Sequence, residues 1–295
     1  MSAAKGGYYL PEPSPWPIVT SAGLFLLALG FVLFLNEKTI HSSIGHWIML
    51  AGAAVIIFMM VRWFGQVISE SEAGTYNDQV DMSFRWGMSW FIFSEVMFFA
   101  AFFGALFYVR HFSVNWLGAD DILWPNYDAS WPTAGPAGPM PVHPHEVPGP
   151  NQFAPMAAMG IPFWNTLILL TSGATVTWAH WGLKAGNRGT LITGLFLTVC
   201  LGLIFLGLQS YEYMHAITEM NLTLHAGVYG ATFYMLTGFH GFHVTMGTIM
   251  LIVILVRSIK GHFTAEHHFG FEGVAWYWHF VDVVWLGLFI FVYAL

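Results

Sequence analysis

Seven long apolar stretches, separated by more polar segments, dominate the pattern along this chain. Each is close to, or longer than, the ~20 residues with which an α-helix crosses a ~30 Å hydrocarbon core. The pattern therefore predicts an all-α membrane protein with seven transmembrane helices. The stretches are Trp16–Leu35, Ile44–Val61, Trp86–Val109, Gly160–Leu183, Thr190–Tyr211, Leu224–Val256 and Gly273–Leu295.

The seven stretches predict a single membrane domain over residues 1–295, without an internal repeat. Residues 16–61 hold helices one and two, and residues 84–109 and 160–295 hold helices three to seven. Between them, residues 110–159 contain the sequence WPTAGPAGPMPVHPHEVPGPNQFAP, which is rich in Pro and Gly. This composition favours a long surface loop, which we expect to be an ordered cap with a flexible centre.

Composition supports the membrane assignment and excludes several other classes of protein. Hydrophobic residues make up 56% of the chain and charged residues 8%, with a mean hydropathy of +0.61. Soluble domains carry about 25% charged residues. The formal net charge of −7, without a run of Lys or Arg, argues against nucleic-acid binding. The single cysteine, Cys200, excludes a disulfide framework and a cysteine-based metal site.

The distribution of Lys and Arg predicts how the chain is oriented in the membrane. With the N-terminus inside, seven basic residues fall on the inner side and two on the outer side, as the positive-inside rule requires. We therefore expect the N-terminus inside and the C-terminus outside. The inner residues are Lys5, Arg62, Arg85, Lys184, Arg188, Arg257 and Lys260, and the outer ones are Lys38 and Arg110.

Two carboxyl groups, Glu95 and Asp282, lie within the predicted spans. An acidic residue at the centre of a membrane helix costs about 2.5–3.5 kcal/mol on insertion scales, so it needs a partner, a proton or a function. His240 and His243 share one helix face, and His279 and Asp282 have the same i, i+3 spacing. We expect Glu95 to bond to a histidine of the sixth helix. A helix clamp is favoured over a proton-linked or lipid-sensing carboxyl.

The fourteen histidines do not predict a metal site. The sequence HFTAEHH, residues 262–268, faintly echoes the histidine boxes of membrane di-iron oxygenases. Those enzymes gather several such boxes on one membrane face, whereas the histidines here are scattered along the chain. We therefore expect interhelical hydrogen bonds and no metal. The chain also lacks a P-loop and a dinucleotide-binding fingerprint.

Several motifs are similar to those of one family, subunit III of haem–copper cytochrome c oxidase. They occur in order along nearly the whole chain, and the last alone covers fifteen residues. The motifs are PSPWP from Pro13, FSEVMFFAAFF around Glu95, TVTWAH ending at His180, TGFHGFHV from Thr237, HHFGFE from His267 and AWYWHFVDVVWLGLF from Ala275.

The resemblance implies a seven-helix bundle in which helices one and two form one arm and helices three to seven the other. A cleft between the arms holds phospholipid. The subunit carries no haem and no copper, and it docks on subunit I, which holds the redox centres and proton channels. The assembled complex oxidises cytochrome c, reduces O2 to water and pumps protons. It lies in a bacterial cytoplasmic membrane or the mitochondrial inner membrane.

The resemblance also implies roles for particular residues. Bound phospholipid is expected at Trp63, Glu70, Arg257 and His262, which match positions lining the family's cleft. The subunit supports proton uptake and stability of subunit I. His267, His268 and Glu272 are candidates for gathering protons at the inner face, and the alternative is that they only cap a loop.

Three other interpretations of the chain stay open at this point. The same subunit could serve a quinol oxidase, because other subunits choose the electron donor. An autonomous, desaturase-like membrane metalloenzyme belongs to a different class. A transporter that uses Glu95 as a proton carrier would need an aqueous path and an inverted repeat, and the sequence shows no such repeat.

Overall fold

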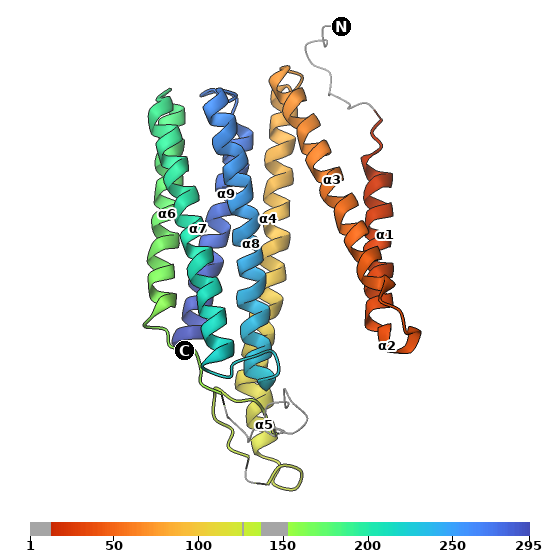
Figure 1. Cartoon of the computed structure of the whole chain (residues 1–295). Coiled ribbons are helices and arrows are strands. Elements are labelled where there is room, and N and C mark those ends of the chain that lie inside the picture. The colour runs from red at the N-terminus through yellow and green to blue at the C-terminus, as the bar shows by residue number, and fades with distance from the viewer. Residues whose placement is uncertain (1–12, 126, 137–152) are drawn as a thin grey trace. The chain divides into compact units, whose positions relative to one another are not determined.

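The computed structural model describes residues 13–125, 127–136 and 153–295, and these residues form helices and connecting segments without a strand (Figure 1). The all-helical prediction is therefore confirmed. In chain order the elements are α1 (Trp16–Leu35), α2 (Glu37–Ile40), α3 (Ile44–Glu72), α4 (Asp78–Tyr108), the π-helix η1 (Val109–Ser113), α5 (Val114–Gly118), α6 (Ile161–Lys184), α7 (Arg188–Thr218), α8 (Gly227–Lys260), α9 (Phe269–Leu288) and the π-helix η2 (Phe289–Ala294).

Six helical segments of the described chain are long and apolar enough to cross a membrane. They are α1, α3, the segment Asp78–Gly118, α7, α8 and the segment Phe269–Ala294. The protein is therefore an integral membrane protein. The remaining predicted span, Gly160–Leu183, forms the helix α6 but is less apolar, because polar residues such as Asn165, Thr166 and Ser172 interrupt it. These three side chains are buried.

Several helices continue beyond the apolar stretches that predicted them. Helix α3 runs on to Glu72, α4 already begins at Asp78, and α7 ends at Thr218. A helix satisfies its own backbone hydrogen bonds, so it does not need to end where the hydrocarbon core ends. The apolar pattern therefore predicted where the membrane spans lie better than it predicted the residues at which the helices begin and end.

The chain divides into two compact units, residues 1–84 and 85–295. In the first unit, α1 packs against α3 through glycine, and Gly23, Gly30, Gly45 and Gly52 are buried. A Cβ atom added at Gly52 would lie 2.6 Å from the backbone nitrogen of Leu27. The two backbones are thus in direct contact, which is how small residues stabilise helix pairs in membranes.

In the second unit, the helices α6, α7, α8 and α9 each contact two others, in the cycle α6–α7–α8–α9–α6. Trp278 of α9 is fully buried between two glycines: Cβ atoms at Gly202 and Gly247 would lie 2.9 and 2.8 Å from its ring. Its indole N–H donates a 2.9 Å hydrogen bond to Ser172 Oγ of α6. Large side chains in this core therefore depend on small or polar residues opposite them.

The long loop between α5 and α6 packs, in its described parts, on the beginning of α8. The backbone N–H groups of Val228 and Tyr229 donate to the carbonyl oxygens of Ala134 and Thr133, both at 3.2 Å. The ring of Phe153 stacks on Tyr229 at 5.3 Å. These contacts agree with an ordered cap, and the centre of the loop at 137–152 lies outside the described residues.

We predict that Gly52→Ala lowers the stability of the first unit by about 1–3 kcal/mol, because its methyl group meets the backbone of α1. Gly65→Ala on the same helix is the matched control, since a Cβ there has no described atom within 4 Å. The measurement is the thermal unfolding midpoint of the detergent-purified protein. Equal midpoints for the two variants would contradict the backbone contact.

Candidate functional site

The predicted bond between Glu95 and the sixth predicted helix is present in the structure. Glu95 lies on α4 and His243 on α8, and Oε2 of Glu95 is 2.8 Å from Nε2 of His243. The other ring nitrogen, Nδ1, donates to the carbonyl oxygen of Phe239 at 2.6 Å. Because Nδ1–H is donated to this carbonyl, a hydrogen bond between Nε2 and Oε2 requires a second proton between these two atoms.

Aromatic side chains surround this Glu95–His243 pair. The ring of Phe99 lies 5.0 Å from the imidazole of His243, and the rings of Phe98 and Tyr277 lie at 6.1 and 6.3 Å. The pair joins α4 to α8 within this apolar shell. Such an arrangement is typical of an interhelical clamp, the role that the sequence favoured.

The other polar residues of the spans have different partners. His240 is buried, and its Nε2–H donates to the carbonyl oxygen of Val281 at 3.1 Å rather than to Glu95. Oδ2 of Asp282 lies 3.5 Å from Nδ1 of His279, whose Nε2 is 3.3 Å from the Thr177 hydroxyl. Glu95 and Asp282 therefore belong to separate pairs.

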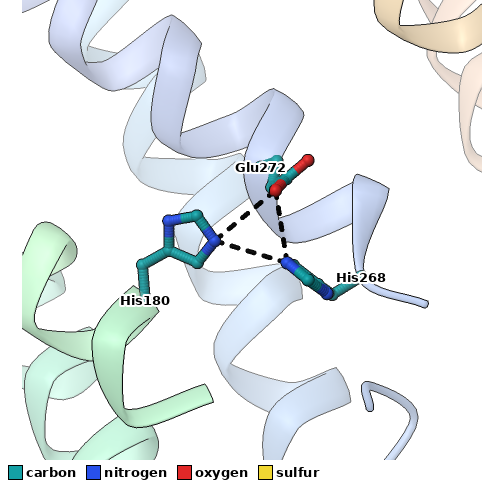
Figure 2. Close-up of side chains that lie close together, drawn as sticks. All are labelled: His180, His268 and Glu272. Carbon is teal, nitrogen blue, oxygen red and sulfur yellow. Dashed lines mark hydrogen bonds and ion pairs between the residues drawn. The ribbon is translucent and has the colours of Figure 1, made fainter. Parts of the chain in front are cut away.

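A second group of polar side chains gathers where α6 ends and α9 begins (Figure 2). His180 comes from the last turns of α6, His268 is the N-cap of α9, and Glu272 lies in the first turn of α9. The Nε2 atoms of the two histidines are 3.4 Å apart. Oε1 of Glu272 is 3.2 Å from Nε2 of His268 and 3.6 Å from Nε2 of His180. We call these three residues the His–Glu cluster.

Two further contacts fix the orientation of the His–Glu cluster. Nδ1–H of His268 donates to the carbonyl oxygen of Thr264 at 3.1 Å. Arg85 of α4 forms an ion pair with Oε2 of Glu272. The guanidinium of Arg85 also lies 5.7 Å from the ring centroid of Phe269. Two imidazole nitrogens and one carboxylate oxygen thus face a common point, an arrangement that can hold a proton or a cation.

The three proton-gathering candidates divide between the cluster and the surface. His268 and Glu272 are buried in the His–Glu cluster, whereas His267 is exposed. The backbone N–H of His267 donates to Thr264 Oγ1 at 3.0 Å. His180, the last residue of the TVTWAH motif, is the third member of the cluster.

The four candidate lipid ligands lie in both units. In the first unit, Trp63 is exposed, and the two carboxylate oxygens of Glu70 accept hydrogen bonds from Gln66 and Tyr76, each at 2.8 Å.

In the second unit, the Arg257 guanidinium lies 4.5 Å from the ring centroid of Phe263. The backbone N–H of His262 donates to the Arg257 carbonyl at 3.1 Å, which ends α8. No measured contact tests their predicted role, which stays a prediction.

Sequence reasoning missed one buried carboxyl, Glu212 of α7. Its Oε1 accepts a 2.7 Å hydrogen bond from the Tyr293 hydroxyl and a 3.4 Å contact from Gln209 Nε2. The predicted span ended at Tyr211, so Glu212 was counted with the following loop. A helical projection of the segment to Thr218 would have placed it on the buried face. Arg85 was missed as the partner of Glu272 because 187 residues separate the two.

The fold and these pairs define a polytopic helical membrane protein in which several intramembrane polar groups bond between helices. The family model of cytochrome c oxidase subunit III matches residues 6–295. The chain therefore belongs to the cytochrome c oxidase subunit III family, as its motifs indicated.

Curated relatives support the same assignment. The chain is 42% identical over 291 residues to cytochrome c oxidase subunit 3 of Prototheca wickerhamii, covering 98% of this chain and 97% of that protein. It is 41% identical over 290 residues to the subunit of Marchantia polymorpha, covering 98% and 96%. It is 40% identical over 294 residues to that of Dugong dugon, covering 99% and 98%.

We predict a coupling free energy of about 0.6–1.7 kcal/mol between Glu95 and His243, which runs from the average to the maximum measured for interhelical hydrogen bonds in a membrane protein. The measurement is a double-mutant cycle on unfolding free energy with Glu95→Ala and His243→Ala. Ser94→Ala paired with His243→Ala is the control, because Ser94 bonds to its own helix at Phe91 O. Additive effects in the Glu95 cycle would show that the pair is not a clamp.

Proposed function

We propose that this chain is an accessory subunit of a terminal respiratory oxidase and carries no redox centre of its own. The observation that carries the proposal is the family match over residues 6–295. The complex would oxidise cytochrome c, reduce O2 to water and pump protons, with haem and copper in partner subunits. The names of the relatives favour cytochrome c over a quinol as electron donor.

The proposed contribution of this chain is to shield and stabilise subunit I and thereby to sustain its proton uptake. Many large apolar side chains are exposed on the isolated chain, including Trp86, Trp90 and Phe93 along α4. Such surface needs lipid or another apolar protein against it. A large apolar partner with ordered lipid would keep water away from the neighbouring face of subunit I.

We propose seven spans, with α6 as the fourth, the N-terminus inside and the C-terminus outside. Helix α6 contains 24 residues, enough to cross the hydrocarbon core, and it packs on α7 and α9. Its polar residues are tolerated because neighbouring helices cover them. The asymmetry of Lys and Arg supports the orientation, and the membrane would be the bacterial cytoplasmic or mitochondrial inner membrane.

Phospholipid binding belongs to the same proposal, with the two helices of residues 16–61 and the remaining five forming two arms around a lipid-filled cleft. Trp63 supplies an exposed aromatic ring of the kind found at membrane interfaces. Arg257 and His262 would contact a phosphate group, and Glu70 an amine headgroup.

Proton gathering at the inner face is the finer part of the proposal. The exposed imidazole of His267 would receive protons from water. His268 is the next residue in the sequence, and Glu272 follows in the first turn of α9. The Thr264 carbonyl orients His268, and Arg85 orients Glu272.

We predict that oxidase purified without this chain retains its haem and copper but loses activity early during repeated turnovers. The measurements are metal and haem content, followed by oxygen consumption over successive substrate additions. Restoring the chain should restore the lifetime. Unchanged turnover and lifetime after depletion would contradict an accessory role in catalysis.

We also predict that Trp63→Ala combined with Arg257→Ala reduces the phospholipid that copurifies with the complex, measured by lipid mass spectrometry. Trp47→Ala is the control, because Trp47 is an exposed tryptophan on the same helix, α3, outside the proposed site. Equal phospholipid in all three proteins would remove these residues from the lipid site.

A further inference from the structure

We propose that the His–Glu cluster is a binding site for one divalent zinc ion, held by Nε2 of His180, Nε2 of His268 and Oε1 of Glu272 (Figure 2). The inference goes beyond the proposed function, which involves no metal in this chain, and departs from the expectation drawn from the sequence. It rests on four features of the cluster: the distances between its ligand atoms, the positions of its protons and lone pairs, the hydrogen-bond partners of its ligands, and its burial.

The dimensions of the cluster match one face of a zinc coordination tetrahedron. Zinc binds imidazole nitrogen and carboxylate oxygen at about 2.0–2.2 Å, which places neighbouring ligand atoms of a tetrahedron roughly 3.3–3.6 Å apart. The three separations here are 3.2, 3.4 and 3.6 Å. All ligand atoms lie within 4.8 Å of one another, so a single ion can reach them with small adjustments.

The positions of protons and lone pairs in the His–Glu cluster indicate that a positive charge belongs at its centre. Nδ1–H of His268 is already donated to the Thr264 carbonyl, so a neutral His268 presents a lone pair at Nε2. That lone pair faces Oε1 of Glu272, which also offers only lone pairs when ionised, at 3.2 Å. Repulsion between them is relieved by an extra proton or by a cation. Because His180 Nε2 converges on the same point, a metal ion satisfies all three groups at once.

Direct hydrogen bonds between the three side chains explain the distances within the His–Glu cluster less well than a shared zinc ion does. Hydrogen bonds between nitrogen and oxygen are usually about 2.7–3.2 Å long, and only the His268–Glu272 contact falls in that range. The contacts of His180, at 3.4 and 3.6 Å, are longer. A purely hydrogen-bonded cluster would draw these groups closer together.

The groups behind the ligands resemble the outer shell of metal sites. A histidine that binds metal usually donates its other ring N–H to a carbonyl or carboxylate, as His268 does to Thr264. A ligating carboxylate is usually hydrogen-bonded as well, and Arg85 occupies Oε2 of Glu272 while leaving Oε1 for the ion. The positive charge of Arg85 repels a cation, so it must weaken the site.

Burial and ligand type select the metal. His268 and Glu272 are buried, while the side chain of His180 is 21% exposed, which leaves access for a water molecule as fourth ligand. Two imidazoles and one carboxylate suit zinc, whereas magnesium and calcium favour oxygen ligands alone. Bound zinc would tie the end of α6 to the beginning of α9.

The test is the zinc content of the intact oxidase complex after incubation with zinc sulfate and dialysis, measured by mass spectrometry of the metals. We expect His180→Gln and His268→Gln to lower the content by one zinc per complex relative to the parent. His267→Gln is the matched control: it changes the adjacent, exposed histidine and should retain that zinc. The amount of this chain in each purified complex, measured by quantitative protein mass spectrometry, shows that the variant has assembled.

Two further readouts test the assignment in complexes that remain assembled. X-ray absorption at the zinc edge of the parent should show two imidazoles and one carboxylate around the zinc that His180→Gln and His268→Gln lose. Arg85→Gln keeps a hydrogen-bond donor but removes the charge, so zinc affinity should rise about tenfold, equivalent to about 1.4 kcal/mol. Identical zinc content in the parent, His180→Gln and His268→Gln complexes would overturn the proposal. That outcome would leave the accessory function untouched, because the depletion experiment tests it separately.

Discussion

The bilayer offers no hydrogen-bond partners to the polar groups of a protein, and the rest of this structure depends on that constraint. Each helix satisfies its own backbone, so a polar side chain inside the membrane is stabilised by a partner on its own or a neighbouring helix. Trp278 bonds to Ser172, Glu95 to His243, and Tyr293 to Glu212. Each bond joins two helices that are far apart in the sequence. Polar residues that are costly in lipid therefore specify which helices pack together.

The same constraint explains how much the sequence could predict. Long apolar runs are needed to cross lipid, so α1 begins and ends where the apolar stretch does, and every predicted span contains a helix. The ends of α3, α4 and α7 were less predictable, because a helix can continue into the polar interface. The fourth predicted span is the least apolar one, since its helix, α6, carries polar residues on faces that other helices cover.

Of the two candidate sites, the sequence predicted one and missed the other. The bond between Glu95 and His243 was predictable, because an isolated carboxyl and a histidine in the apolar layer each require a partner. The meeting of His180 with His268 and Glu272 was not, because 88 residues separate the two histidines and each lies near the end of a helix, where water could serve instead. Only the packing of α6 on α9 brings them together.

These arrangements support one account of the chain. We propose that its intramembrane polar groups are structural clamps and that the chemistry of the oxidase takes place in the partner subunits. The most direct test is infrared difference spectroscopy of the intact oxidase between its oxidised and reduced states, with wild-type protein and Glu95→Gln. The account predicts identical carboxyl bands in the two proteins, because Glu95 keeps its bond to His243 throughout the cycle. A carboxyl band that appears in the wild type and disappears in Glu95→Gln would show that Glu95 changes its protonation or hydrogen bonding with the redox state, and would contradict the account.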